Sequence, residues 1–528
     1  MTGMFSRTTH RMDASWGRLF RWWLRGLVLV ALASAAASRP ALPLRPNILY
    51  ILADDLGVGD LSCLNARCAW RTPHLDRLAQ GGRIFTDAHS ASGVCTPSRY
   101  TLLTGRYSWR GALKSGVLYG YDPALIEPGR PTVPSFLREH GYVTAMIGKW
   151  HLGLDWAKTG PQPEAVDYLR PFGGGPSAHG FDRFYGLAAS LDMPPYVYLV
   201  NDRVSALPTN HVAASPAPKL WRAGAISSDF QHAEVQQRFT DRAIEYLTEQ
   251  RAGAGSKPFF LYLAFASPHT PIVPTGSFDG QTHTNPYGDY VTQLDADVGR
   301  ILGALEKLQL ATNTLVIFTA DNGCSPAANL DQLRTFNHDP SAGYRGHKAD
   351  LFEGGHRIPF LARWPGQIPA GTRCAQTIGQ GDLLATCAEL LATPMPVGAG
   401  EDSVSLLPLL RGGEHVPRGR AGLVHHSING SFAIRDGRWK LLLAPDSGGW
   451  SAPHPGTKET NGLPRVQLYD LVADPGEQRN QQAAHPEIVR RLGHQLRELV
   501  ERGRSTPGPS VAVDRSKPWP QIEVLREY

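Results

Sequence analysis

Four segments of the chain consist almost entirely of apolar residues, and each ends in a polar cluster. They are Asn47–Ala53, Tyr142–Ile147, Phe259–Phe265 and Thr314–Ala320. Continuous apolar runs of this length are typical of strands that are buried on both faces of a sheet. Helical patterns precede two of these runs, at Thr132–His140 and Tyr290–Leu308. This alternation predicts an α/β fold with a large, mostly parallel sheet flanked by helices.

Residue types that bind ions or transfer protons follow all four predicted strands. In an open α/β sheet, ligands bind in the crevice beyond the carboxyl ends of the strands. One polar strand end is unremarkable, because chains often leave a sheet through polar residues. Four such ends predict a functional site at one edge of the sheet. The residues concerned are Asp54, Asp55, Lys149, His151, His269, Asp321 and Asn322.

The pattern changes after about residue 400, where the strand-like segments become shorter. Ser431–Arg435 and Trp439–Leu443 flank the turn Asp436-Gly437, and Val466–Leu471 follows. An amphipathic helix is predicted from Pro486 to Arg502. We therefore expect a main domain at residues 39–400 and a smaller C-terminal domain at residues 401–528, with an antiparallel sheet and one packed helix.

Residues 1–38 have the pattern of an export signal. Several arginines lead into the apolar run Gly26–Ala33, and small residues of the kind that precede signal-peptidase cleavage follow it. We expect cleavage near Ala37 and a protein exported to the periplasm or the medium. The competing interpretation, a membrane anchor, requires about 20 uninterrupted apolar residues. Arg25 and Arg39 confine this run to fewer, so no membrane association is expected after cleavage.

Composition limits the possible function classes. With 42% hydrophobic and 19% charged residues in 528, the chain is an ordinary globular protein of two to three structural units. Most of the formal charge of +6 comes from the arginines of the export signal, and the rest of the chain has 48 basic and 46 acidic side chains. A nearly neutral chain has no basic field to attract nucleic acid, so no nucleic-acid partner is predicted.

Other features permit two interpretations each. In an oxidising compartment Cys63 can pair with Cys68, and Cys374 with Cys387, although sequence does not fix disulfide connectivity. The long segments at residues 159–183 and 201–230 are predicted to be lids or binding loops rather than inert excursions. An aromatic cluster either stacks on sugar rings or belongs to the core, and it comprises Tyr107, Trp109, Tyr119 and Tyr121. Several histidines are assigned no role, namely His338, His347, His425 and His426, and His356 is expected to pack behind Lys348.

The most specific stretch begins at Cys95. Cys95 lies in a turn that contains Gly, Pro and Ser, at the start of a predicted helix, where helix N–H groups favour an anion. That placement alone suits either a thiolate nucleophile or a buried cysteine. The full stretch Cys95-Thr-Pro-Ser-Arg99, with the trailing Leu102-Leu-Thr-Gly-Arg106, resembles the signature of the formylglycine-dependent (type I) sulfatases. The similarity extends from residue 47 to about 480 and is strongest to the arylsulfatase A and N-acetylgalactosamine-6-sulfatase branch.

The resemblance implies an alkaline-phosphatase-like sandwich and a specific set of site residues. It implies that a maturation enzyme oxidises Cys95 to formylglycine, whose hydrated form is the nucleophile that cleaves a sulfate monoester. The implied metal ligands are Asp54, Asp55, Cys95, Asp321 and Asn322. The implied catalytic residues are Cys95, Arg99, Lys149, His151, His269 and Lys348; Lys348 is recognised by the Glu353-Gly-Gly355 that follows it five residues later.

The chemistry of these residues agrees with that assignment. Three carboxylates and an amide oxygen form a set of hard oxygen ligands, which suits Ca²⁺ or Mg²⁺ rather than zinc. We expect Ca²⁺. Lysine ammonium groups stabilise sulfuryl oxygens, and a histidine protonates the leaving oxygen near neutral pH. We therefore expect a sulfuric-ester hydrolase that acts on a sulfated saccharide or an aryl sulfate.

Two other functions remain open at this point. A phosphonate monoester or phosphodiester hydrolase of the same superfamily would use the same charges on a phosphoryl group. A non-catalytic protein that binds sulfated glycans would result if Cys95 is never oxidised. The sequence does not identify the substrate, the position of sulfation, endo or exo action, or the oligomeric state.

Overall fold

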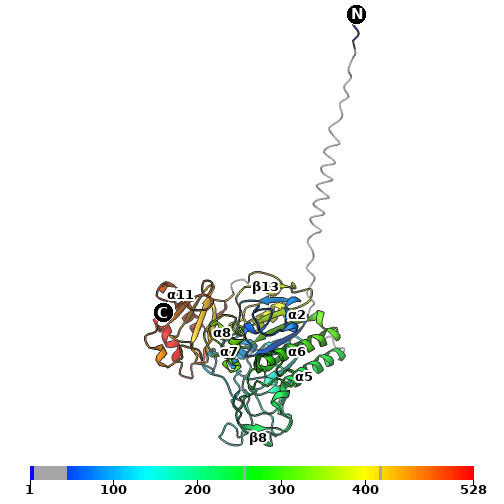
Figure 1. Cartoon of the computed structure of the whole chain (residues 1–528), viewed down its shortest axis with the longest axis vertical. Helices are drawn as coiled ribbons and strands as arrows, with labels where there is room; N and C mark the ends of the chain where they lie inside the picture. Colours follow the sequence, from blue (N-terminus) through cyan, green and yellow to red (C-terminus); the bar gives the residue numbers. More distant parts are fainter. Residues whose placement is uncertain (5–44, 218, 254–256, 416–418) are drawn as a thin grey trace. The chain divides into compact units, whose positions relative to one another are not determined.

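The structure is a computed structural model, and it describes residues 1–4, 45–217, 219–253, 257–415 and 419–528. Apart from its first four residues, the predicted export signal at residues 1–38 lies outside the described part of the chain. Residues Arg45–Tyr528 form one compact unit (Figure 1).

A ten-stranded mixed sheet forms the centre of this unit. Its central strands run parallel in the order β11-β1-β10-β4-β5, and antiparallel neighbours flank them on both sides. In the order of the sheet, the strands are β13 (Thr372–Cys374), β2 (Arg83–Phe85), β12 (Phe360–Arg363), β11 (Thr314–Ala320), β1 (Asn47–Asp54), β10 (Phe259–Pro268), β4 (Val143–Lys149), β5 (Arg183–Leu187), β6 (Leu199–Val200) and β7 (Arg203–Val204).

All four predicted strands are present, and they are the adjacent strands β11, β1, β10 and β4. Every residue of β1, β10 and β11 is buried, as expected for strands covered on both faces. Strand β5 was missed, because Arg183–Leu187 contains a glycine and lies at the end of a segment that was predicted to be a loop. It nevertheless continues the parallel run beside β4.

Two groups of helices cover the sheet. Helices α2 (Pro73–Gln80), α5 (Val235–Ala252) and α6 (Pro286–Lys307) form one group, and α5 and α6 lie side by side in Figure 1. Helices α3 (Cys95–Thr104), α4 (Val133–Glu139) and α9 (Leu383–Leu390) form the other group. The predicted helices at Thr132–His140 and Tyr290–Leu308 correspond to α4 and α6.

The C-terminal part forms a second, antiparallel sheet with one packed helix, as predicted. The order is β15 (Leu423–His426), β16 (Phe432–Asp436), β17 (Trp439–Leu442) and β18 (Gln467–Asp470). Helix α11 (Pro486–Arg502) packs its apolar face against this sheet. The domain boundary at residue 400 stays a prediction.

The segment at residues 201–230 is only partly irregular. It contains the short hairpin of β8 (Asn210–Val212) and β9 (Gly224–Ile226), in a lobe that projects from the main sheet in Figure 1. The aromatic cluster divides: Tyr107 and Trp109 are buried in the core beneath the second sheet, whereas Tyr119 is 51% exposed. The core interpretation therefore holds for the first two residues.

The disulfides that the sequence left open, Cys63 with Cys68 and Cys374 with Cys387, are not formed: all six cysteines are free. The Cys68 thiol donates to the carbonyl of Asp60 at 3.4 Å, so it points toward the backbone rather than toward Cys63. Cys374 lies on β13 and Cys387 on α9, where each thiol is buried in a different packing environment.

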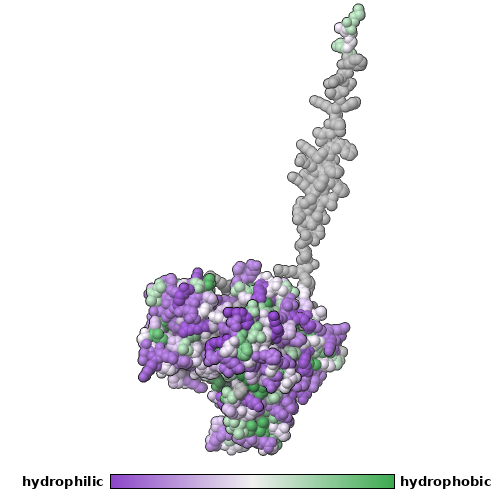
Figure 2. Space-filling view, viewed as in Figure 1, coloured by the Kyte–Doolittle hydropathy of each residue, from purple (hydrophilic) through white to green (hydrophobic). Residues whose placement is uncertain are grey.

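The surface seen in Figure 2 is mostly hydrophilic, with hydrophobic residues in small, separate groups. Among the described helices, none combines the length and the apolar composition that crossing a bilayer requires.

Replacing Leu492 by Ala tests the packing of α11 on the second sheet. Leu492 is fully buried in that core, so its loss leaves a cavity and is expected to lower the free energy of unfolding by about 2–5 kcal/mol. Arg490→Ala, an exposed change on the same helix, is the control and should cost about 0.5 kcal/mol or less. Denaturant-induced unfolding followed by circular dichroism measures both. Equal stability of the two variants would contradict this packing.

Candidate active site

The parallel strands bring the predicted residues to one edge of the sheet. Ala53 pairs with Ala320 in the register of β1 and β11, so Asp54 and Asp55 leave the sheet beside Asp321 and Asn322. Strand β10 ends just before His269, and β4 ends at Lys149. Because β11, β1, β10 and β4 are adjacent and parallel, their carboxyl ends meet at a single crevice.

Hydrogen bonds connect the residues that follow β1 with those that follow β11. The backbone N–H of Asp55 donates to Oδ1 of Asp321 at 3.2 Å, and Nδ2 of Asn322 donates to Oδ1 of Asp55 at 2.7 Å. Asp55 has φ of 62°, in the left-handed region that non-glycine residues rarely adopt. Such strain persists where the surroundings fix the backbone, and it clusters at functional sites.

Three cationic side chains neutralise the three carboxylates. Lys149 Nζ donates to Asp54 Oδ2 at 2.6 Å, and Lys348 Nζ donates to Asp55 Oδ2 at 2.8 Å. Arg99 donates from Nε to Asp321 Oδ2 at 2.9 Å, and from Nη1 to the carbonyl of Lys149. All of these side chains are buried.

The pKa values of two carboxyl groups in this cluster are shifted in opposite directions. Burial by itself raises the pKa of Asp54, but the charges of Lys149 and the other cationic groups around it together outweigh burial and hold that pKa below its ordinary value. Burial, and then the neighbouring charge of Asp54, raise the pKa of Asp321. A divalent cation among these oxygens would relieve the repulsion between the two carboxylates.

Cys95 is the first residue of α3, and its side chain points into this cluster. Its thiol lies 3.6 Å from Asp54 Oδ1, and the residue is 2% exposed. Burial raises the pKa of the Cys95 thiol above its ordinary value, an effect that Lys149 only partly offsets. A neutral thiol is a weak nucleophile. The unmodified side chain therefore does not fit the thiolate interpretation.

The two histidines present one ring nitrogen each to the site. His151 Nε2 donates to the carbonyl of Leu118 at 2.7 Å, which leaves Nδ1 buried, unprotonated and without a partner. Burial and the charge of Lys149 lower the pKa of His151, so its ring is neutral. His269 donates from Nδ1 to the carbonyl of Thr270 at 2.7 Å, and its Nε2 lies 3.6 Å from Asp55 Oδ2.

The acidic residues fit a hard divalent cation. Asp54, Asp55 and Asp321 supply carboxylate oxygens, and Asn322 adds an amide oxygen, Oδ1, which is buried and has no hydrogen-bond partner. Ligand atoms of Asp54, Asp55, Cys95 and His269 lie within 4.8 Å of one another. An orphaned acceptor beside three carboxylates suits Ca²⁺ or Mg²⁺, which prefer oxygen ligands.

Comparisons with known proteins agree with this geometry. The family model described as Sulfatase matches residues 46–393. An N-acetylgalactosamine-6-O-sulfatase of Bacteroides thetaiotaomicron is 35% identical, over 87% of this chain and 94% of its own length. Human arylsulfatase A is 34% identical, over 94% of this chain and 95% of its own length.

The chain belongs to the sulfatase family. A solved structure from Bacteroides thetaiotaomicron, described in connection with the metabolism of multiple glycosaminoglycans, superimposes with a TM-score of 0.75 at 33% identity. The match covers 87% of this chain and 99% of that one. The sulfatase is thus an enzyme with the alkaline-phosphatase-like fold, and the family assignment agrees with the resemblance found in the sequence.

The sequence did not reveal one buried carboxylate beside this site. Asp192 follows β5, the fifth parallel strand, and its Oδ1 has no hydrogen-bond partner and lies 4.0 Å from His269 Nδ1. Arg222, from the segment at residues 201–230, pairs with the other oxygen and lies over the ring of Tyr119. Recognising β5 as a strand would have placed Asp192 among the strand-end residues.

Arg99→Met tests the buried ion pairs of the sulfatase. It removes the partner of Asp321 and leaves a buried, uncompensated carboxylate, so the free energy of unfolding is expected to fall by about 3–5 kcal/mol. Arg438→Ala is the control, because Arg438 pairs with Asp470 at an exposed position and such pairs contribute about 0–1 kcal/mol. Urea unfolding of both variants gives the comparison. An Arg99→Met protein as stable as the Arg438→Ala protein would refute the assigned pairing.

Proposed function

We propose that this sulfatase hydrolyses sulfate monoesters of carbohydrates, and also aryl sulfates, with residue 95 as the nucleophile in its formylglycine form. The observation that carries the proposal is the position of Cys95. Its side chain lies at the start of a helix, within a cluster of three carboxylates, two lysines and an arginine. Each of these groups has a place in the transfer of a sulfuryl group.

The lysines and Arg99 provide fixed positive charge. A sulfate monoester is a singly charged anion, and cleavage moves further negative charge onto the bridging oxygen. Lys149 and Lys348 are buried and held by carboxylates, so they need no reorganisation when the sulfuryl oxygens arrive. Arg99 holds Asp321 and the backbone of Lys149, which makes it a positioning residue.

Residue 95 requires modification for this chemistry. When oxidised by a maturation enzyme and hydrated, its side chain offers two hydroxyls on one carbon: one supplies the nucleophile for sulfur, and the other allows sulfate to leave as the aldehyde re-forms. The buried thiol by itself lacks both properties. The maturation enzyme is therefore the protein partner that this site requires.

The two histidines move the protons. His151 has a buried lone pair at Nδ1, because Nε2 donates to Leu118, and this nitrogen can take the proton of the second hydroxyl. His269 keeps Nδ1–H on the carbonyl of Thr270, so Nε2 is the atom that exchanges a proton with the leaving oxygen. Lys348 binds the carboxylate of Asp55, which also lies next to His269, and it assists the departure of the leaving oxygen.

A calcium ion would be held by Asp54, Asp55, Asp321 and Asn322, with residue 95 as a further ligand. When bound, the cation polarises the sulfuryl oxygens and lowers the pKa of a hydroxyl at residue 95. Magnesium, which also prefers oxygen ligands, is the second choice.

The sugar class of the substrate rests on the names of the relatives and on the surroundings of the site. One matched relative is an N-acetylgalactosamine-6-O-sulfatase. Tyr119 is exposed, and Arg222 and Asp192 add polar groups beside His269. Exposed aromatic and polar groups at the rim suit a hydroxyl-rich ring. For the location, we propose export through the predicted signal at residues 1–38.

Replacement of Cys95 provides the test of reaction and nucleophile. The protein, co-produced with a formylglycine-generating enzyme, should hydrolyse 4-nitrophenyl sulfate faster than the corresponding 4-nitrophenyl phosphonate monoester or bis(4-nitrophenyl) phosphate, a phosphodiester. Cys95→Ala should lose this activity by a factor on the order of 10³ or more. Cys387→Ala, a buried free cysteine on α9, is the matched control and should retain it.

Mass spectrometry of the peptide that contains residue 95 accompanies this assay. An aldehyde at position 95 with sulfate turnover supports the proposal. Dominant phosphonate hydrolysis would instead support the rival hydrolase, and an intact thiol in protein from its native source would support the non-catalytic binder.

Chelation tests the metal. Removing divalent ions should abolish turnover of 4-nitrophenyl sulfate, because the site would lose the cation that polarises the sulfuryl oxygens, and added Ca²⁺ should restore it. Asn322→Ala removes the unpartnered Oδ1 and should raise the Ca²⁺ concentration needed for half-maximal recovery by about 10–100-fold. Full turnover by the metal-free enzyme would rule out a cation requirement.

A further inference from the structure

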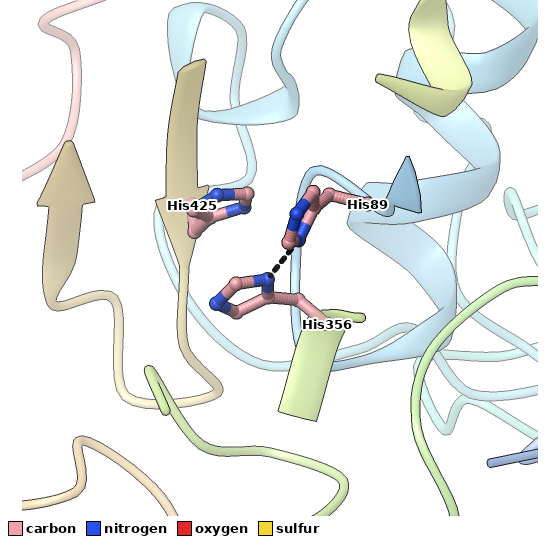
Figure 3. A group of neighbouring side chains, drawn as sticks. All are labelled: His89, His356 and His425. Carbon is pink, nitrogen blue, oxygen red and sulfur yellow. Dashed lines mark hydrogen bonds between the residues drawn. The ribbon is translucent and has the colours of Figure 1, made fainter. Parts of the chain in front are cut away.

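A second cluster of metal-binding side chains lies away from the candidate active site. It consists of His89 on β3 (Ala88–His89), His356 at the end of α8 (Glu353–His356) and His425 on β15 (Figure 3). All three rings are completely buried, and one nitrogen of each lies within 4.8 Å of the others. Three distant segments of the chain therefore converge on this point.

Each ring has an acceptor on its outer nitrogen. His89 Nε2 lies 2.8 Å from Oδ1 of Asp87, His356 Nε2 lies 3.1 Å from the carbonyl of Leu351, and His425 Nδ1 lies 3.2 Å from the carbonyl of Ser90. Histidines that ligate metals almost always donate their other N–H to a carboxylate or a backbone carbonyl. That arrangement fixes the tautomer and leaves the inner nitrogen unprotonated.

The inner nitrogens lack a complete set of protein partners. His89 Nδ1 and His356 Nδ1 lie 3.0 Å apart and can share at most one proton; Figure 3 draws this contact as a dashed line. His425 Nε2 is buried without any hydrogen-bond partner. When all three outer nitrogens donate, three lone pairs face one another. A cation among them satisfies all three.

We propose that His89, His356 and His425 form a second metal site, which takes a zinc-class transition ion through three imidazole nitrogens. Neutral imidazole suits zinc, copper and nickel, whereas calcium and magnesium require oxygen ligands. The site is thus chemically distinct from the acidic site at Asp54 and Asp55. It also revises the sequence analysis, which assigned no role to His425 and only packing to His356.

The charges around the cluster allow a cation. Asp87 contacts His89 directly and also binds Arg357 and Arg435. Oε2 of Glu353 lies 3.9 Å from His89 Nε2 and has no hydrogen-bond partner. Lys440 Nζ lies 2.9 Å from His356 Nε2, but it also binds Glu353 at 3.0 Å and Glu477 at 2.9 Å. Lys440 therefore keeps two carboxylate partners when His356 donates to Leu351. Arg435 Nη1 likewise lies 2.9 Å from His89 Nε2, and it keeps its hydrogen bond to Asp87 when His89 donates to that carboxylate.

The location gives the ion a structural purpose. His425 belongs to the second sheet, whereas His89 and His356 belong to the segments that surround the main sheet. Helix α8 begins five residues after Lys348. An ion bound here would fasten the second sheet to the segment that carries this lysine.

Metal content of His425 variants tests the site. The full-length protein is stripped with a chelator, saturated with Ca²⁺ to fill the acidic site, titrated with Zn²⁺ and freed of excess ion. Wild type should retain one molar equivalent of zinc, and His425→Gln should lose it. His426→Gln is the matched control: it is the next residue of β15, is equally buried, binds the carbonyl of Lys114 and should retain the zinc.

A thermal shift gives an independent readout. Zinc should raise the Tm of wild type and of His426→Gln by a few degrees, because an ion that binds only the folded state stabilises it, and it should leave His425→Gln unchanged. If that variant does not fold, X-ray absorption at the zinc edge of wild type decides, since three imidazoles give nitrogen scattering. Wild type that retains no more zinc than His425→Gln, or shows only oxygen ligands, would overturn the site and leave a hydrogen-bonded histidine cluster.

Discussion

The whole candidate active site depends on burying three carboxylates next to three cationic side chains at the ends of parallel strands. Either set alone would be prohibitively costly in a dry interior, because an unpaired buried charge is destabilising by several kcal/mol. Together, Asp54 with Lys149, Asp55 with Lys348, and Asp321 with Arg99 satisfy one another. The arrangement concentrates positive charge for an anionic substrate and oxygen ligands for a cation within the same few ångströms.

The sheet solves the problem of bringing these partners together. The register between β1 and β11 sets Asp54 and Asp55 beside Asp321 and Asn322, and β10 and β4 add a histidine and a lysine from the next two strands. Helix α3 then places Cys95 and, one turn later, Arg99 against the same carboxylates. Positive φ angles at Asp55 and His151 show that the backbone is strained where its chemistry is concentrated.

The second sheet contributes more than a cover for the main one. Lys440 of β17 binds Glu353 of α8, and Arg110 binds Asp402 in a buried pair that links the region after α3 to the chain before β15. The first of these contacts holds α8, which begins five residues after Lys348. The histidine cluster lies beside Lys440 and is separate from the acidic residues of the candidate active site. The two clusters offer different ligand atoms, nitrogen in one and oxygen in the other, and so suit different ions.

The sequence by itself determined the four central strands, the three predicted helices, the small C-terminal sheet and the types of residue in the crevice. It could do so because apolar periodicity, strand-end chemistry and the Cys95 stretch are local patterns. Only the tertiary structure decided which carboxylate pairs with which cation, that β5 brings Asp192 beside His269, that the cysteines stay unpaired, and that His89, His356 and His425 meet. Those outcomes depend on contacts between residues up to several hundred positions apart, whose spacing no local pattern encodes.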